Sequence, residues 1–507
     1  MTEASLFLQR YSRGWRGDLA ALLAGAVTPL AFAPLNWWPA AILSIAVLFS
    51  LWLFSDVRRA TWRGFFFGVG MFGVGINWIF VSIYFHGFVP LFLSLVLTAA
   101  LVLVMSIFPA LLGNLIARAL SVRFERRYTQ LKLLLLMPAA WMLFEWFRGW
   151  FLTGFPWLSL GYSQVDGPLA GWAPLVGVFG VSWLIALSAA LLVAVVLEKQ
   201  GRYFYVAGLA FIWVLALPMN STYWTTSNNA PLKVALLQGN IPQDLKWHPD
   251  VRRPTIELYT ELTRNHWDAD LIVWPETAVP AFRYEVETFL DDLEAEAQRN
   301  ETDLLLGLLT HGDDNVSYYN TILSLGSSRE QYHKDHLVPF TEYLPMKWLL
   351  GNVVRFMQVP MSDFNAGGSD QAPLNVAGQR AGISICFEDA FGEEVIRALP
   401  EATFLVNVSN DAWFDDSWAP PQHLQMARMR ALETERPLLR ATNTGMTAIV
   451  DAKGRVLAQA PQFEIATISE TIQPRTGSTL YAMTGNWLMV CLAFITVFVA
   501  AWRARLN

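Results

Sequence analysis

Long apolar runs near the two ends of this 507-residue chain constrain its fold more than any other feature of the sequence. The runs fall at about 18–34, 38–54, 64–86, 88–114, 131–148, 170–198, 204–220 and 485–502. Each approaches or exceeds the roughly 17–25 residues that a helix needs to cross the hydrocarbon core of a bilayer. The sequence therefore predicts a polytopic α-helical membrane protein with about eight spans.

The middle of the chain differs in character from its ends. Hydrophobic residues make up 54% of the whole chain and charged residues 15%, which is too apolar for an ordinary soluble protein. Residues 221–484, however, have the mixed composition of a globular domain. We expect about seven helices in residues 1–220, this domain in 221–484 and a last helix in 485–507. The net charge of −6 gives no reason to expect a nucleic-acid partner.

Basic residues predict the orientation of the chain in the membrane. They cluster before the first run and then in every second connection, at Arg10, Arg13, Arg16, Arg58, Arg59, Arg63, Arg118, Arg123, Arg126, Arg127, Lys132, Lys199, Arg202, Arg503 and Arg505. The alternate connections are nearly free of them, and Arg148 is the main exception. By the positive-inside rule, both termini are cytoplasmic and residues 221–484 lie on the external side.

The globular part alternates β-rich runs with segments of helical spacing. We expect strands at Leu232–Ile241, Leu271–Trp274, Leu304–Leu309, Tyr318–Leu325, Ala381–Phe387, Ala402–Val408 and Met446–Val450. Helices are expected at Val251–Asn265, Glu285–Arg299 and Gln422–Thr434. This pattern predicts a layered α/β domain in which helices cover a sheet.

Cys386 ends one of these strand-like runs and is the only cysteine in the globular part, because the other cysteine, Cys491, lies in the last apolar run. A disulfide between them would join a soluble domain to the lipid interior, so we expect Cys386 to be unpaired. An exposed free thiol on the oxidising side of a membrane is a liability unless its reactivity is used. Cys386 is therefore a candidate nucleophile, although composition alone favours a small core hydrophobe.

Two more reactive side chains follow strand-like runs, Glu276 in Trp274-Pro275-Glu276 and Lys334 in His333-Lys334-Asp335. A cysteine nucleophile needs a group to take its proton and a positive charge to favour the thiolate and the later oxyanion. Burial would raise the pKa of Glu276 toward the range of a working base, and Lys334 would supply the charge.

Each of these residues also has an alternative interpretation without catalysis. Glu276 could be a carboxylate at a helix N-terminus, and Lys334 could be a solvated surface charge. His333 and His336 have the spacing of metal ligands, but no cysteine or carboxylate cluster completes a site, so we expect surface histidines and no metal.

Taken together and in this order, Glu276, Lys334 and Cys386 resemble the Glu-Lys-Cys triad of the nitrilase superfamily, whose fold is an α-β-β-α sandwich. Further stretches are similar to one membrane-embedded branch, the bacterial apolipoprotein N-acyltransferases: Gln238–Gln243 with Trp247, Leu337–Pro345, and Asn410–Phe414. The chain departs from many members of that branch at Asp415, where they carry Gly, and from some at Phe387, where they carry Tyr. The second departure puts in doubt a role for a hydroxyl beside the nucleophile.

The resemblance implies an acyl transfer in two half-reactions without a cofactor. Cys386 takes an acyl chain from a membrane phospholipid as a thioester, and the α-amine of a diacylglyceryl-cysteine on an apolipoprotein then accepts it. Glu276 would be the general base and acid, Lys334 would stabilise the oxyanion, and Glu342 and Glu388 would support them. Trp247, Phe340, Tyr343 and Trp413 are candidate walls for acyl chains, with aromatic core residues as the alternative. The expected protein is a monomer of the bacterial inner membrane with a periplasmic catalytic domain.

Two other functions fit parts of the sequence. A membrane-tethered amidase would use the same triad to hydrolyse a carbon–nitrogen bond, but it would need no platform of several membrane helices. A transporter or channel with a binding domain would need an ion pathway, whereas charged residues within the apolar runs are few, Glu145 and Arg148 among them. The sequence therefore favours the acyltransferase.

Overall fold

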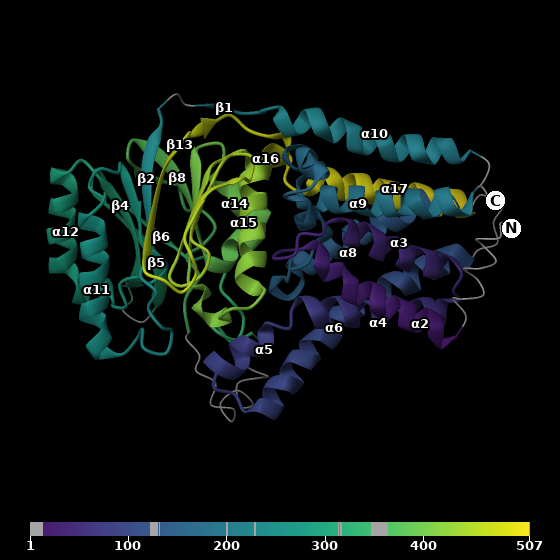
Figure 1. Ribbon diagram of the computed structural model, residues 1–507, viewed down its shortest axis with the longest axis horizontal. Coiled ribbons are helices and arrows are strands. Elements are labelled where there is room, and N and C mark those ends of the chain that lie inside the picture. Colours follow the sequence, from purple (N-terminus) through teal and green to yellow (C-terminus); the bar gives the residue numbers. More distant parts are fainter. Residues whose placement is uncertain are drawn as a thin grey trace. The chain divides into compact units, whose positions relative to one another are not determined.

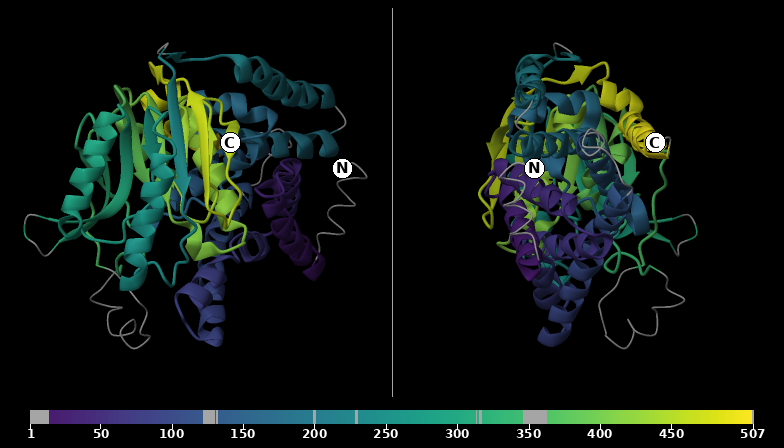
Figure 2. Two further views of the ribbon diagram at one scale, coloured as in Figure 1. Left: turned by 60° about the vertical axis from the view of Figure 1, so that its left-hand side comes forward. Right: turned by 90° about the vertical axis from the view of Figure 1, so that its right-hand side faces the viewer.

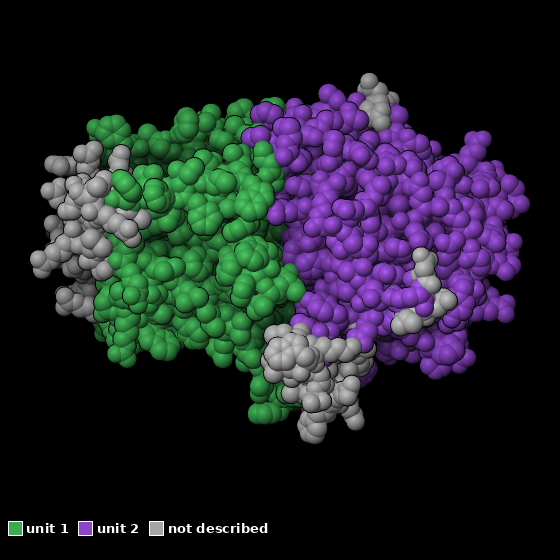
Figure 3. Space-filling model, turned by 180° about the vertical axis from the view of Figure 1, so that it is seen from behind, with its two compact units in different colours: residues 1–80, 91–222, 484–507 green, residues 81–90, 223–483 purple. Residues whose placement is uncertain are grey.

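The computed structural model describes residues 14–121, 130, 132–198, 201–227, 230–312, 314, 317–345 and 363–505 (Figure 1, with further views in Figure 2). Several of the basic residues that predict the orientation lie outside this part of the chain: Arg10, Arg13, Arg123, Arg126, Arg127 and Lys199. The chain divides into two compact units, which Figure 3 distinguishes by colour. The first comprises residues 1–80, 91–222 and 484–507, and the second comprises residues 81–90 and 223–483.

Helices occupy all the apolar runs of the first unit. They are α2 (Trp15–Val27), α3 (Pro39–Leu53), α4 (Val57–Gly75), α6 (Leu91–Ser121), α8 (Met137–Trp150), α9 (Ala173–Leu197), α10 (Arg202–Ser221) and α17 (Trp487–Arg505). Among the described residues, three helical stretches are long and apolar enough to cross a membrane, Leu91–Ala119, Pro168–Leu197 and Arg202–Ser221. A fourth span is possible if Val57–Gly75 and Ile79–His86, which meet at a 59° bend, are counted as one.

The number of full-length spans in the described residues is thus smaller than the number of apolar runs. Several runs end in short helical turns or contain prolines, so the regular helix is shorter than the apolar run. The turn Thr28–Ala31, with Pro29 inside it, follows α2, and α3 begins only at Pro39. Pro39–Leu53 and Trp487–Ala500 are apolar helices of 10–17 residues, shorter than a full span.

The two charged residues of α8 are used locally. Arg148 donates hydrogen bonds to the carbonyl oxygens of Phe155 (2.5 Å) and Trp157 (2.6 Å). Glu145 accepts one from the backbone N–H of Leu160 (3.0 Å). Because buried backbone groups need partners, these side chains fix the connection that follows α8. Their role here is structural.

Two six-stranded sheets form the centre of the second unit. One has the order β13-β2-β3-β4-β5-β6, with bounds Ala466–Ile472, Leu232–Gln238, Leu271–Val273, Asp303–His311, Tyr318–Leu325 and Gln331–His333. The other has the order β12-β11-β10-β9-β8-β7, with bounds Val456–Gln459, Ala448–Val450, Leu438–Thr442, Phe404–Ser409, Gln379–Ile385 and Leu374–Val376. A separate small sheet pairs β1 (Thr226–Ser227) with β14 (Arg475–Thr476).

The layers of this unit follow from which faces are apolar. Side chains from both sheets, such as Leu305 and Val406, share one buried cluster, so the sheets pack face to face. The outer face of the first sheet is covered by α11 (Pro249–Arg264) and α12 (Glu287–Arg299). The outer face of the second is covered by α15 (Ala419–Thr434), as Figure 1 shows. The expected α-β-β-α sandwich is confirmed.

Parallel strands lie at the centre of both sheets and position the loops that matter. In one sheet β3 runs parallel to β2 and β4. In the other, β9 runs parallel to β8 and β10. The predicted strand Ala381–Phe387 ends earlier, at Ile385, because Cys386 has a left-handed backbone with φ 53° and opens a short helical turn, Cys386–Ala390. The loops beyond the carboxyl ends of such strands are where α/β proteins build their sites.

Candidate active site

The structure brings Glu276, Lys334 and Cys386 together, with Glu342 as a fourth member. Lys334 Nζ lies 2.7 Å from Glu342 Oε1 and 3.9 Å from Glu276 Oε1. The Cys386 thiol interacts electrostatically with both Glu276 and Lys334. Lys334 is 0% exposed and Glu276 is 6% exposed. The alternative that Lys334 is a solvated surface charge is therefore wrong.

Glu276 stands on a tight turn three residues beyond β3, so it is not at a helix N-terminus. This turn packs closely against Gly307 on β4, where a Cβ would clash with the backbone of Thr277. Thr277 itself has a left-handed backbone, with φ 47°. Asn320 Nδ2 donates a 2.6 Å hydrogen bond to Glu276 Oε1. Burial raises the pKa of Glu276, with Lys334 opposing that rise. This is the behaviour of a carboxylate suited to proton transfer.

Lys334 follows β6 directly, and its backbone N–H donates to the carbonyl oxygen of Asn320 (2.8 Å). Glu342 also accepts a 2.7 Å hydrogen bond from the N–H of Val338, so one carboxylate both pairs with Lys334 and closes the loop after it. Burial alone would lower the pKa of Lys334, but the carboxylates of Glu342 and Glu276 outweigh it and raise that pKa. The two carboxylates thus favour the charged ammonium form of Lys334 despite its burial.

Cys386 is partly exposed, and both cysteines of the chain are free, as expected. Burial, followed by the negative charge of Glu276, raises the pKa of the Cys386 thiol to about 12. The resting thiol of Cys386 is therefore protonated, with Glu276 close by. Its reactivity depends on removal of that proton during the reaction, because the thiolate is the attacking species.

Glu388 connects the end of β8, next to Cys386, to the segment after Lys334. Its carboxylate accepts hydrogen bonds from the backbone N–H groups of Ile385 (2.6 Å), Asp335 (2.6 Å) and His336 (3.0 Å), and from the Tyr332 hydroxyl (3.1 Å). Burial raises the pKa of Glu388 to about 7, against the opposing effect of these backbone donors. Glu388 is a structural anchor of the site.

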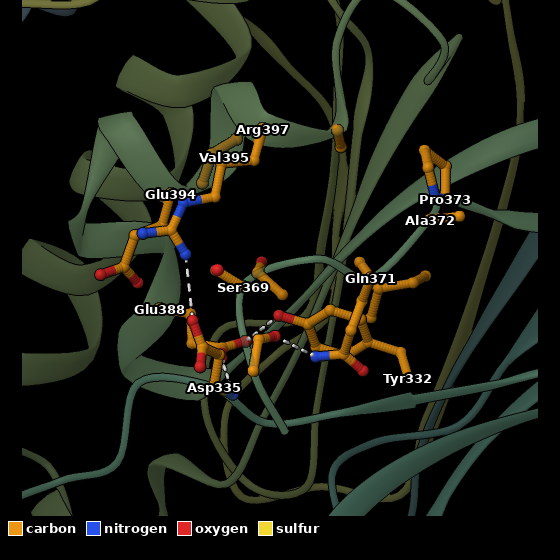
Figure 4. Close-up of a pocket in the computed structure, with 14 residues that line it drawn as sticks. Tyr332, Asp335, Ser369, Gln371, Ala372, Pro373, Glu388, Glu394, Val395 and Arg397 are labelled. Carbon is orange, nitrogen blue, oxygen red and sulfur yellow. Dashed lines mark hydrogen bonds and ion pairs between the residues drawn. The ribbon is translucent and has the colours of Figure 1, made fainter. Parts of the chain in front are cut away.

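A polar pocket lies beside this anchor, and Figure 4 shows Tyr332, Asp335 and Glu388 among its lining residues. Arg397 pairs with Asp335 across 3.0 Å. Cys386 is not among the residues that line the pocket. The pocket and the Cys386 thiol are therefore distinct features, and Glu388 lines the pocket while bonding to the backbone next to Cys386.

Sequence reasoning missed a second buried lysine, Lys246. It is 3% exposed, and its Nζ donates to the carbonyl oxygen of Glu276 (3.1 Å) and to Thr277 Oγ1 (3.1 Å). Burial lowers the pKa of Lys246 to about 8, while Glu276 and Cys386 oppose the change. Its only sequence signal was a lysine between two apolar residues in Leu245-Lys246-Trp247, which does not distinguish it from a surface lysine.

The four candidate acyl-chain residues lie outside the core. Trp247 is 51% exposed and Phe340 is 53% exposed, and Tyr343 and Trp413 are half-buried. Trp413 packs edge-on against His86, whose Nε2 lies 3.0 Å from Asp415 Oδ1. His86 comes from the short segment 81–90, which belongs to the second unit.

His333 and His336 each have local partners. His333 Nδ1 lies 2.9 Å from Thr321 Oγ1, and His336 Nδ1 lies 2.8 Å from Glu394 Oε1. Within the described ranges, no group of three or more His, Cys, Asp or Glu residues is arranged to hold a metal ion.

Comparison with known proteins matches both units. The family model for the apolipoprotein N-acyltransferase N-terminal domain matches residues 24–191, and the carbon-nitrogen hydrolase model matches residues 233–481. Apolipoprotein N-acyltransferases of Methylococcus capsulatus, Nitrosomonas europaea and Vibrio cholerae are similar to the chain, at 46%, 42% and 40% identity. Each alignment covers 96% of this chain, and 96%, 97% and 97% of the respective relative.

Proposed function

The chain belongs to the apolipoprotein N-acyltransferase family and N-acylates lipoproteins, and on that premise we propose that the acyl chain passes through a thioester on Cys386. The observation that carries the proposal is the fully buried ammonium of Lys334, paired with Glu342 and near both Glu276 and Cys386. A buried charge is costly unless it is used and paired. The ammonium of Lys334 lies near Cys386, where the negative charge of the oxyanion would develop during acyl transfer.

In the first half-reaction, Glu276 takes the proton of the Cys386 thiol as the sulfur attacks an ester carbonyl of the donor lipid. A carbon–sulfur bond forms, and the carbonyl electrons move to the oxygen, giving a tetrahedral oxyanion that Lys334 stabilises. The carbon–oxygen bond to the glycerol then breaks. Glu276 returns the proton to the departing alkoxide, which releases a lysophospholipid and leaves the thioester.

In the second half-reaction, Glu276 removes a proton from the α-ammonium of the diacylglyceryl-cysteine. The free amine attacks the thioester, a carbon–nitrogen bond forms, and Lys334 again stabilises the oxyanion. The carbon–sulfur bond breaks, the second proton of the nitrogen passes to the departing thiolate, and Glu276 releases the first proton to water. The same carboxyl group thus serves as base in both halves and as acid in the first.

The balance of charge supports this sequence of steps. Two buried lysines, Lys246 and Lys334, lie close to the carboxylate of Glu276, and Glu342 is the second carboxylate. Moving a proton from Cys386 to Glu276 leaves the total charge of this group unchanged. Proton transfer therefore needs no charge to enter or leave a poorly solvated site.

We assign supporting roles to Glu342 and Glu388. Glu342 holds Lys334 in place and closes its loop, while Glu388 fixes the end of β8 relative to the segment after Lys334. The exposed rings of Trp247 and Phe340 suit contact with acyl chains, because they leave a large apolar area uncovered. Tyr343 and Trp413 would add half-buried walls.

We place the catalytic domain at residues 221–484, on the periplasmic side of the bacterial inner membrane. The helical segments 1–220 and 485–507 would flank it, with both termini in the cytoplasm and the protein acting as a monomer. The alternation of basic connections supports this orientation. The donor would be a membrane phospholipid and the acceptor a diacylglyceryl apolipoprotein.

The test is intact-mass measurement of purified protein after incubation with a phospholipid of defined acyl chains. The wild-type protein is expected to gain the mass of one acyl group, removable by hydroxylamine, and Cys386→Ala is expected to gain none. Absence of an adduct on the wild type would remove the acyl-enzyme from the mechanism. Equal labelling of Cys386→Ala would move the nucleophile to another residue, with the exposed Cys491 the first to examine.

A further inference from the structure

A fully buried charged cluster lies around the carboxyl ends of β8, which leads to Cys386, and the neighbouring β9. Arg440, on β10, contacts Asp389 Oδ2 (3.1 Å) through Nη1 and Asp411 Oδ2 (3.1 Å) through Nη2. His423, on α15, places Nε2 2.8 Å from Asp389 Oδ1 and Nδ1 2.9 Å from Arg440 Nη2. These four residues, the Arg440 cluster, are all buried.

Stability alone gives little reason for such a cluster. Taking charges out of water costs about as much as their mutual attraction returns, so well-packed apolar residues can often replace a buried ion group without loss. Burial by itself would raise the pKa of Asp411, but the charge of Arg440 and the nearby His423 outweigh it and lower that pKa. Asp411 is therefore a fixed anion, able to accept hydrogen bonds but unsuited to act as a base.

Two connections lead from the cluster to Cys386. Arg440 Nη1 donates to Asn407 Oδ1, and Asn407 Nδ2 donates to the carbonyl oxygen of Cys386 (3.1 Å). Separately, Ser409 Oγ donates to Asp411 Oδ1 (2.9 Å), and hydrogen bonding by Ser409 opposes the rise that burial causes in the pKa of the Cys386 thiol. One connection thus reaches the backbone of the nucleophile, and the other reaches its sulfur.

The backbone connection addresses a conformational cost. Cys386 has φ 53°, in the left-handed region that a residue with a Cβ adopts only when its surroundings enforce it. Asn407 Nδ2 donates to the Cys386 carbonyl oxygen and also to Ser384 Oγ (3.0 Å), which lies on β8 just before Cys386. Arg440 in turn fixes the amide of Asn407, which makes the strained conformation the preferred one.

The sulfur connection involves a hydroxyl with a single proton. In the resting site this proton points to Asp411, while the thiol keeps its own proton. Once Glu276 has taken the thiol proton, rotation about the Ser409 side chain lets the same hydroxyl donate to the thiolate. A hydrogen bond to an ionised sulfur is stronger than one to a neutral acceptor.

We propose that the Arg440 cluster positions the nucleophile, holding the Cys386 backbone through Asn407 and placing the Ser409 hydroxyl beside the sulfur. Asn407, Ser409 and Arg440 are positioning residues in this scheme, because the cluster reaches the reaction only through Cys386. The inference rests on the proposed role of Cys386 as the nucleophile.

The test measures the reactivity of Cys386 toward iodoacetamide across the alkaline pH range, in the full-length protein without lipid. Mass mapping separates Cys386 from Cys491, and Cys386→Ala confirms the assignment. Ser409→Ala removes one donor and leaves the fold in place, so we expect the midpoint of alkylation to rise by about one pH unit, a rate about tenfold lower at a given pH below the midpoint. The matched control Ser324→Ala, also buried but bonded to Ser328 and Glu330, should behave as wild type.

An unchanged midpoint in Ser409→Ala would overturn the sulfur connection. For the backbone connection, Arg440→Lys keeps the charge but cannot bond Asn407 and both carboxylates at once, so Cys386 alkylation should fall about tenfold or more while the exposed Cys491 stays unaffected. Cys386 reactivity in Arg440→Lys equal to that of the wild type would overturn the backbone connection. If Arg440→Lys does not fold, the same measurement is made on Asn407→Ala. Since alkylation requires no acyl transfer, a failure of the proposed function would appear separately, as acylated Cys386→Ala.

Discussion

Lys334 donates a 2.7 Å hydrogen bond to Glu342 while its own side chain is wholly excluded from solvent. Glu276 Oε1 lies further from the same nitrogen, at 3.9 Å. The ammonium is thus held firmly by one carboxylate and only loosely by the other. That asymmetry leaves Glu276 available to accept a proton.

We predict that Glu342→Gln slows acyl-enzyme formation about a hundredfold, although Glu342 touches no reacting atom. Without its partner, Lys334 should move toward Glu276 and pair with it, which lowers the pKa of the catalytic carboxyl. The free energy of unfolding should also fall, by about 3 kcal/mol, because the pair is largely buried. Rapid-quench mass spectrometry measures the first effect and denaturant unfolding the second; wild-type acylation rates in Glu342→Gln would rule out the positioning role.

Glu276→Gln should abolish acylation yet stabilise the fold in a pH-dependent way. Burial raises the pKa of Glu276, so the folded protein holds this proton more tightly than the unfolded chain does. Ionising Glu276 therefore costs the folded state stability as the pH rises above the ordinary carboxyl pKa. The melting temperature of Glu276→Gln relative to wild type should be higher at neutral than at mildly acidic pH. A difference that shrinks as the pH rises would contradict this sign.

Lys246→Met should reduce acylation about tenfold at neutral pH, because it removes both a positive charge near Cys386 and the anchor of the Glu276 turn. Since burial lowers the pKa of Lys246 to about 8, the wild type loses this charge as the pH rises through that value. Above pH 8, the acylation rate of the wild type should therefore approach that of Lys246→Met. Wild-type stability should rise with pH between about 8 and the ordinary lysine value, where only the unfolded chain binds the proton, and the variant should lack that rise.

Trp247→Ala should impair use of lipid substrate with little effect on folding. Half of this side chain is exposed, so truncation should change the free energy of unfolding by less than about 0.5 kcal/mol. The matched control is Trp274→Ala, because Trp274 is 0% exposed and packs in the sandwich, where truncation should cost about 3–5 kcal/mol. The measurement is the KM for the phospholipid, together with the free energy of unfolding. In Trp247→Ala we expect this KM to rise without loss of stability. An unchanged KM in that variant would exclude contact between Trp247 and the acyl chains.

The sequence predicted those features that depend on short stretches of chain. Apolar runs located the helices, and β-rich runs located strands such as β5, for which the expected and observed bounds agree. The edge strand β13 was missed because four of its seven residues are Thr, Ser or Glu, and its pairing with β2 joins segments more than 200 residues apart. Three-residue strands such as β6 and β7 carry too few side chains to show an alternation.

The same limit applies to the active site. Residues directly after strands, such as Cys386 and Lys334, could be singled out because reactive side chains gather at strand ends. Lys246 and Arg440 could not, since each reaches the site only through tertiary packing, and buried lysine and arginine look in sequence like surface residues. Their burial and partners, rather than their spacing, reveal what they do.

The small sheet of β1 and β14 sets Thr226 opposite Thr476, so the stretch 223–483 of the second unit begins and ends in one two-stranded neck. Glu435 reinforces this neck by accepting from the N–H groups of Trp224 and Thr225. A module whose two ends meet can be inserted into a host chain at a single point without reordering the elements around it. The stretch 223–483, which carries the sandwich, therefore has the connectivity of an inserted module, because its two ends meet at one place between α10 and α17.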